Sequence, residues 1–169
     1  NRVSPSIANW VLQQIIPNSY QYELIDLKDI NLPLLNEPKP ASNNEYKFEY
    51  TKEWSKLIGS FSGFIIVTGE YNGGYPAVLK NALDHLYLEW NDKPVGFVSY
   101  GYSAKGARAM EQLKQVAAGL KLQLVNTSLS ISLANEYKDG KVQTSDELTN
   151  QIRQISSEIE TILNNKDSK

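Results

Sequence analysis

Apolar residues follow two different spacings, which alternate from one end of the chain to the other. Strands are predicted where the apolar run is continuous or takes every second position, at 20–27, 63–68, 93–99 and 122–133. Helices are predicted where apolar residues recur three and four positions apart, at 4–16, 46–59, 77–87, 107–120 and 144–163. Because unbroken apolar strands need cover on both faces, this alternation predicts an α/β domain built on a parallel sheet.

Length and charge add limits to this picture. The 169 residues suffice for a sizeable core, and we treat 1–169 as one domain. A net charge of −2 gives no reason to expect nucleic acid or a membrane surface as a partner, and no window is apolar enough to span a bilayer. The absence of cysteine excludes disulfides and thiol catalysis, and it fits a cytoplasmic location.

The chain is poor in side chains that catalyse reactions by themselves. Its one histidine, His85, lies within a predicted helix, where a structural role is the usual one. Neither a metal site nor a Ser-His-Asp triad has support. Loops rich in Gly, Tyr, Asn and Ser instead suggest a bound cofactor that carries the reactive group, and a flavin fits.

The stretch 69–76 connects a buried strand to a helix and is the best candidate for a ligand site. In open α/β sheets, ligands bind outside the carboxyl ends of the strands. Gly73 and Gly74 would let backbone amides approach a ligand, and a second glycine- and tyrosine-containing loop follows the strand 93–99. The alternative is a plain turn, because Gly-Gly and a proline at a helix start, here Pro76, are common in both cases.

The string from Glu70 to Asp84, Glu-Tyr-Asn-Gly-Gly-Tyr-Pro-Ala-Val-Leu-Lys-Asn-Ala-Leu-Asp, resembles the signature of the NADPH-dependent FMN reductase family. That signature runs roughly Pro-Glu-Tyr-Asn-x-x-x-Pro-x-x-Leu-Lys-Asn-Ala-Ile-Asp. Gly69 departs from it, since the family often has proline there, and we expect a slightly looser turn. The resemblance implies FMN as cofactor, NADPH or NADH as co-substrate, and ping-pong hydride transfer to a quinone, azo dye, flavin or metal-ion acceptor.

The resemblance also implies a flavodoxin-like three-layer α/β/α fold with a parallel five-stranded sheet in the order 2-1-3-4-5. The family opens with an apolar strand that ends in Gly-Ser-x-Arg-x-x-Arg and wraps the FMN phosphate. Here Arg2 aligns with the second arginine, and Ser4 and Pro5 look like the start of the first helix, with the Ser4 hydroxyl as its cap. We therefore expect the native polypeptide to contain a further apolar strand upstream, about 5–6 residues long, with the rest of the phosphate loop.

The resemblance implies a cofactor site with three parts. Arg2 and Ser4 would hold the phosphate, although a solvated Arg2 is the alternative. The flavin ring would lie against the first loop, at Glu70, Tyr71, Asn72, Gly73, Gly74 and Tyr75. The opposing wall would be formed by Ser99, Tyr100, Gly101 and Ser103. Ser99 and Ser103 could equally be helix caps.

Two questions stay open at this point. The helix 77–90 has apolar residues on more than one face, which favours either deep burial or the homodimer interface that the resemblance implies. The function could also be that of a flavodoxin-type electron carrier or of a non-catalytic flavodoxin-like binding protein. The nearly neutral charge and the lack of a Thr/Ser-rich phosphate loop argue against the carrier.

Overall fold

The computed structural model describes residues 2–16 and 19–167. Its centre is a three-stranded parallel sheet in the order β1 (Phe64–Gly69), β2 (Pro94–Gly101) and β3 (Gln123–Ser132). The ends of β1 and β2 are in register, because Gly69 pairs with Tyr100. The strands predicted at 63–68, 93–99 and 122–133 are therefore confirmed.

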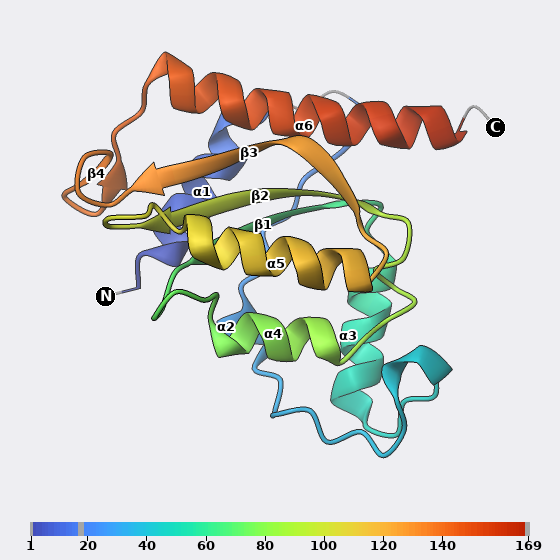
Figure 1. The fold of residues 1–169 in the computed structure, drawn as a ribbon. Coiled ribbons are helices and arrows are strands. Elements are labelled where there is room, and N and C mark those ends of the chain that lie inside the picture. The colour runs from blue at the N-terminus through green and yellow to red at the C-terminus, as the bar shows by residue number, and fades with distance from the viewer. Residues whose placement is uncertain (1, 17–18, 168–169) are drawn as a thin grey trace.

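Helices cover both faces of this sheet (Figure 1). On one face lie α1 (Ser4–Gln14) and α6 (Asp146–Asp167), and on the other lie α3 (Glu49–Gly59), α4 (Ala77–Asp84) and α5 (Ala107–Gly119). Alternate residues of β2 serve the two layers, so that Val98 packs toward α1 and α6 whereas Phe97 packs toward α5. The predicted three-layer α/β fold with a parallel sheet is confirmed.

The structure corrects the strand predicted at 20–27. Residues 21–26 are extended but belong to no strand, and the chain then enters the short helix α2 (Leu27–Ile30). A strand exists only where a neighbour completes its hydrogen-bond ladder, and no described residue pairs with this segment. The described part of the chain therefore has a three-stranded main sheet, not the five strands predicted.

The helix predicted at 77–87 ends earlier, at Asp84. In a continued helix the carbonyl of Leu83 would accept from the amide of Tyr87. It accepts instead from the indole N–H of Trp90, at 3.1 Å, and from the amide of Leu86, at 3.4 Å, while the Tyr87 amide donates to the Glu89 carboxylate. The buried Trp90 thus closes the helix by folding the following turn back against it.

The remaining elements are short. The 3₁₀ helix η1 (Ala41–Asn43) precedes α3, and a small hairpin, β4 (Tyr137–Lys138) with β5 (Lys141–Val142), precedes α6. The polar turn predicted through Asp139 and Gly140 is the turn of this hairpin, and both residues have positive φ. Ser4 does not cap α1, contrary to expectation, because the N-cap position is Val3 and Ser4 is already helical. Within the described residues, no helix is long and apolar enough to cross a bilayer.

Candidate functional site

A tight turn follows β1 at its carboxyl end. The amide of Tyr71 donates to the carbonyl of Gly74 at 2.8 Å, and the amide of Gly74 donates back at 3.0 Å. Asn72 and Gly73 between them have φ values of 51° and 82°. Two successive positive φ values define a hairpin turn of the type for which Asn-Gly is the preferred pair. The glycine therefore meets a backbone requirement, and the turn is a defined structure.

A second turn of the same kind follows β2. The amide of Ala107 donates to the carbonyl of Ala104 at 2.8 Å, and Lys105 and Gly106 have φ values of 52° and 83°. A Cβ on Gly106 would lie 2.8 Å from the backbone nitrogen of Tyr100, so the turn folds tightly onto the strand end. Because β1 and β2 are paired and parallel, both turns lie at one edge of the sheet, as predicted.

The first turn presents free hydrogen-bond donors. No described residue accepts a hydrogen bond from the backbone amide of Asn72 or of Gly73. A Cβ built on Gly73 would have no heavy atom within 4 Å. The neighbouring residue Tyr71 is 66% exposed, and Tyr102, in the second loop, is 74% exposed. Free amides beside exposed aromatic rings fit a planar ligand with heteroatoms at its edge, as a flavin has.

The start of α1 meets the same edge through Tyr100. Burial raises the pKa of this buried tyrosine, and the side chain of Ser4 lies near enough to its hydroxyl to lower that pKa in part. Arg2 donates two hydrogen bonds to Asp26, at 2.8 and 2.7 Å, and this guanidinium holds the pKa of the Asp26 carboxyl below its usual range. The predicted phosphate residues thus lie near the strand ends, with Arg2 already engaged by a carboxylate.

Three other predicted site residues, Ser99, Glu70 and Tyr75, have side chains that contact the rest of the protein. Ser99 is fully buried, and its hydroxyl donates to the carbonyl of Lys105 at 2.9 Å, which holds the second turn from below. The carboxylate of Glu70 binds Arg108 on α5. Tyr75 is half-buried in the core on the α4 side. Ser103, in contrast, is exposed at the surface of the second loop, and the carbonyl of Gly101 in that loop accepts from the amide of Leu133. Because the Ser99 hydroxyl donates to a carbonyl, Ser99 does not act as a helix cap.

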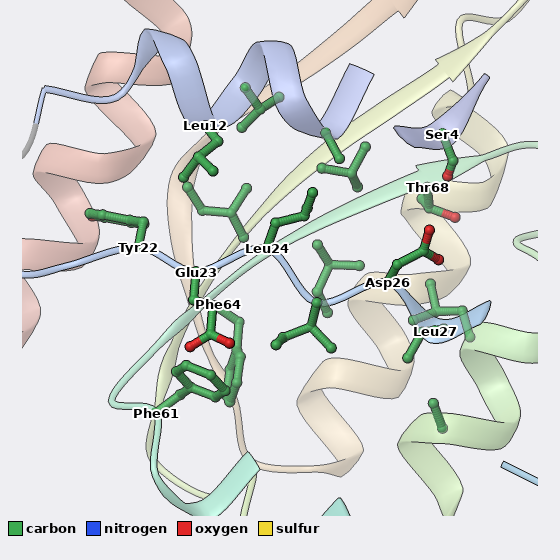
Figure 2. A pocket seen from close by; sticks show the side chains of 18 of the residues that line it. Ser4, Leu12, Tyr22, Glu23, Leu24, Asp26, Leu27, Phe61, Phe64 and Thr68 are labelled. Atoms are coloured by element: carbon green, nitrogen blue, oxygen red, sulfur yellow. The ribbon is translucent and has the colours of Figure 1, made fainter. Parts of the chain in front are cut away.

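A cavity of about 350 Å³ separates β1 from the extended segment 21–26 (Figure 2). Asp26, Thr68 and Ser4 lie at one end of it, and Glu23, Phe61 and Phe64 lie at the other. It has side chains of α1 on one side and of α3 and α4 on the other, and its lining is mainly apolar. We call this cavity the slot. The slot lies in the layer of the sheet. Only its end at Asp26 and Thr68 is therefore on the side of the sheet where the two turns lie.

Sequence reasoning missed Asp26, Thr68 and Gln112 at this edge, and for Lys105 and Arg108 it offered a nucleotide phosphate or solvent as partner, whereas Arg108 binds Glu70. A signal was available for Thr68, since it is the polar end of a buried apolar run. Asp26 could have been found as the polar end of the run 20–27, and it also accepts from the amide of Lys28 at the start of α2. Gln112 gave no signal, because amide side chains on a helix are usually solvated.

Comparison with known proteins identifies relatives along most of the chain. A model of the NADPH-dependent FMN reductase family matches residues 1–136. The chain is 44% identical over 138 residues to an NAD(P)H-dependent FMN reductase of Schizosaccharomyces pombe, covering 80% of this chain and 68% of that protein. It is 38% identical over 136 residues to an NAD(P)H-dependent FMN reductase of Saccharomyces cerevisiae, covering 73% and 71%.

A more distant relative is a 2-hydroxy-1,4-benzoquinone reductase of a Burkholderia species, 30% identical over 121 residues, covering 68% of this chain and 63% of that protein. Among solved structures, the flavoenzyme NAD(P)H:(acceptor) oxidoreductase FerB of Paracoccus denitrificans has a TM-score of 0.73, covering 97% of this chain and 92% of that one. At 19% identity this likeness shows the fold. The family match includes both turns and the strands that carry them, and the chain therefore belongs to the NADPH-dependent FMN reductase family.

Proposed function

We propose that this chain is an FMN-dependent NAD(P)H oxidoreductase whose cofactor lies against the two turns. The observation that carries the proposal is the turn 71–74, where two adjacent free amides stand beside an exposed tyrosine at the sheet edge. Bound FMN would supply hydride acceptance from NADPH or NADH and electron transfer to a second substrate. The chain itself would supply position and electrostatics, which agrees with a sequence that has one histidine and no cysteine.

Each part of the site has a distinct task in this proposal. The amides of Asn72 and Gly73 would donate to the heteroatom edge of the ring, and Tyr71 would cover its face. Gly101 and Ser103 would form the opposing wall. The phosphate would lie near Ser4 and Arg2, because a guanidinium has five N–H donors and the two bonds to Asp26 leave others available.

Four predicted residues would act without direct side-chain contact with the ring. Ser99 and Tyr100 are buried, so they would shape the second wall from below. Glu70 would act through its ion pair with α5, and Tyr75 would anchor the end of the turn in the core.

The acceptor class in this proposal is a small planar oxidant such as a quinone. The exposed rings of Tyr71 and Tyr102 flank the edge where such a molecule would stack. A shared exposed face would also require NAD(P)H to leave before the acceptor binds, which is a ping-pong order.

The function is tested by comparing two glycines with the same backbone conformation. Gly73 and Gly140 both have φ near 80° and no heavy atom within 4 Å of a built Cβ, but only Gly73 lies in the proposed site. Gly73→Ala and Gly140→Ala should therefore cost similar stability. Only Gly73→Ala should weaken FMN binding, by about tenfold, because its methyl group would occupy space through which the ligand approaches the amides.

The same preparation also separates the alternative functions. Flavin colour that NADPH bleaches and a quinone restores supports the reductase. Flavin that NADPH cannot reduce indicates an electron carrier instead. Failure to bind FMN, both alone and with the strand peptide described in the Discussion, contradicts any flavin-dependent function.

We further propose that the complete sheet has five strands in the order 2-1-3-4-5. Residues 20–27 would be the edge strand, and a strand outside the described residues would fill the slot. The support is positional: the slot lies between β1 and the extended segment 21–26, with helices on both sides, as an inner strand requires. Its end at Ser4 lies at the start of α1, so a strand parallel to β1 would lead directly into that helix.

We also propose that the protein is cytoplasmic and forms a homodimer whose interface includes α4. Val78, on α4, is an apolar residue left 52% exposed, and Leu34, in the loop beside α4, is 81% exposed. The side chain of Asn81 fixes this loop to α4, since it accepts from the amide of Leu35 and donates to the carbonyl of Pro33, both at 2.8 Å. Exposed apolar residues on a rigid helix and an adjoining loop are typical of an interface.

A further inference from the structure

We propose that Arg108 and Gln112 on α5 are positioning residues that fix the turn 71–74 in the shape its cofactor needs. This inference rests on the proposed function. It concerns side chains on a different element from the turn, one that the family resemblance in the sequence did not include.

The first contact is made by Glu70, which directly precedes the turn. Its carboxylate accepts from Nε of Arg108 at 2.7 Å and from the backbone amide of Arg108 at 3.2 Å, and Nη2 of Arg108 lies 2.5 Å from the same carboxylate. The Glu70 side chain is only 8% exposed. The Arg108 side chain is 63% exposed, but the buried carboxylate accepts from several donors at once, and this fixes its geometry better than a single ion-pair contact would.

Glu70 also caps α5. The N-cap residue of that helix is Gly106, whose lack of a side chain leaves no capping hydrogen bond from this position. The carboxylate of Glu70 lies at the amide of Arg108, in the first turn of α5, where a negative charge is stabilised by the helix dipole. The start of the turn and the start of the helix therefore stabilise each other.

The second contact is made by Gln112, one helical turn after Arg108. Its Nε2 donates to the carbonyl of Gly73 at 3.1 Å, and its Oε1 would lie 3.0 Å from a Cβ built on Gly74. Positions 108 and 112 share one face of the helix. Two side chains on this face thus hold both ends of the turn, and the free amides of Asn72 and Gly73 lie between the two points.

This arrangement also explains the charge of Arg108. An arginine in the first helical turn beside a ligand site could bind a nucleotide phosphate, but this guanidinium is already paired with Glu70. Its role is therefore to keep the turn in place, since a shift of the turn by even 1 Å would misdirect the amides that bind the cofactor.

The test uses the 169-residue chain with Arg108→Ala, Gln112→Ala and a matched control, Lys114→Ala. Lys114 lies on the same helix and pairs only with Glu111 among the described residues. Amide hydrogen exchange at Tyr71 and Gly74 reports the turn without any cofactor. FMN binding, measured by flavin fluorescence, reports the site. Denaturant unfolding identifies any variant that has simply lost its fold.

We expect Arg108→Ala and Gln112→Ala to speed exchange at Tyr71 and Gly74 and to raise the FMN Kd about tenfold, with Lys114→Ala unchanged. Arg108→Lys should recover part of the loss, because it restores the charge but not the Nε contact. Unchanged exchange would overturn the inference, and so would faster exchange with unchanged FMN affinity. If the unaltered chain binds no FMN with or without the strand peptide, the proposed function fails, and the positioning of a cofactor fails with it. Exchange then still shows whether α5 holds the turn.

Discussion

The side chain of Tyr100 occupies the space where Gly69 would carry a Cβ. A Cβ built on Gly69 lies 2.8 Å from Cε2 and 2.9 Å from Cζ of this ring, well inside van der Waals contact. The two residues are register partners on β1 and β2, and Tyr100 is buried. The sequence predicts that Gly69 loosens the turn, because it replaces a frequent proline. The structure gives it a different role, since a glycine here lets the Tyr100 ring lie over the end of β1 and reach Ser4.

We expect Gly69→Ala to destabilise the protein by about 1–3 kcal/mol, the usual cost of overpacking a buried site. Urea unfolding at neutral pH measures it. Gly59→Ala is the control, because a Cβ there would meet nothing within 4 Å. Combining Gly69→Ala with Tyr100→Leu should cost less than the sum of the two single changes. Strict additivity would mean that the ring does not exclude the side chain.

The Arg2–Asp26 ion pair, at one end of the slot, predicts that the stability of the folded protein depends on pH. The guanidinium of Arg2 lowers the pKa of Asp26 in the folded protein, whereas the unfolded value is about 3.9. The pair therefore contributes stability that is fully present above the unfolded pKa and is lost as pH falls through the lower folded pKa. We expect the stability difference between the unaltered chain and Asp26→Asn to shrink below about pH 4. Urea titrations across that range measure it.

Arg2→Gln provides the check on this prediction. Because Arg2 is the main cause of the shift, its removal should reduce the same pH-dependent increment. A stability difference that stays constant down to low pH in both variants would show that the pair is not formed in solution.

Sequence patterns correctly predicted the elements that are determined by residues close together in the sequence. The strand 63–68 and the loop 69–76 are local features, and Pro76, Gly73 and Asn72 determine much of the turn by themselves. The failures involve contacts between distant residues. The run 20–27 has the alternation of a strand, but a ladder partner decides whether it becomes one. The helix 77–87 has the right spacing throughout, but Trp90 takes the carbonyl of Leu83. Likewise, nothing near Ser99 in the sequence indicates that its hydroxyl faces Lys105.

His85 is the only histidine, and the structure gives it a role in packing. The fully buried ring donates from Nε2 to the carbonyl of Pro33 at 3.1 Å and accepts through Nδ1 from Thr51 at 3.2 Å. His85→Leu removes the hydrogen-bond partner of both the Pro33 carbonyl and the Thr51 hydroxyl, and it should cost about 1–3 kcal/mol of stability. Activity per folded molecule should not change. A double-mutant cycle with Thr51→Val should show coupling, whereas a fall in kcat with stability intact would assign His85 to the chemistry.

The slot predicts that the chain accepts an apolar strand added in trans. A peptide with about six apolar residues, rich in Val and Ile and flanked by polar residues, has the length of an average strand. We expect it to raise the melting temperature by several degrees at saturation and to slow amide exchange in β1, because binding only to the folded state stabilises it.

A matched peptide with proline at its centre is the control for this experiment. Proline removes a ladder hydrogen bond and does not fit an inner strand. Equal stabilisation by both peptides would show that the slot binds apolar material without forming a strand. No stabilisation by either would remove the support for a five-stranded sheet.

The exposed face of α4 predicts the oligomeric state. Val78 and Leu34 are exposed apolar residues, and the bond from the Leu35 amide to Asn81 fixes their two segments together. A charge at the centre of such a patch must be buried without a partner when two copies associate, and this cost greatly exceeds the usual effect of a surface substitution. We therefore expect the unaltered chain to be a dimer by light scattering and Val78→Asp to be a folded monomer. Leu124→Asp, at an exposed apolar position on β3, should remain a dimer. A monomeric unaltered chain, or a dimer that tolerates the aspartate at 78, would place any interface elsewhere.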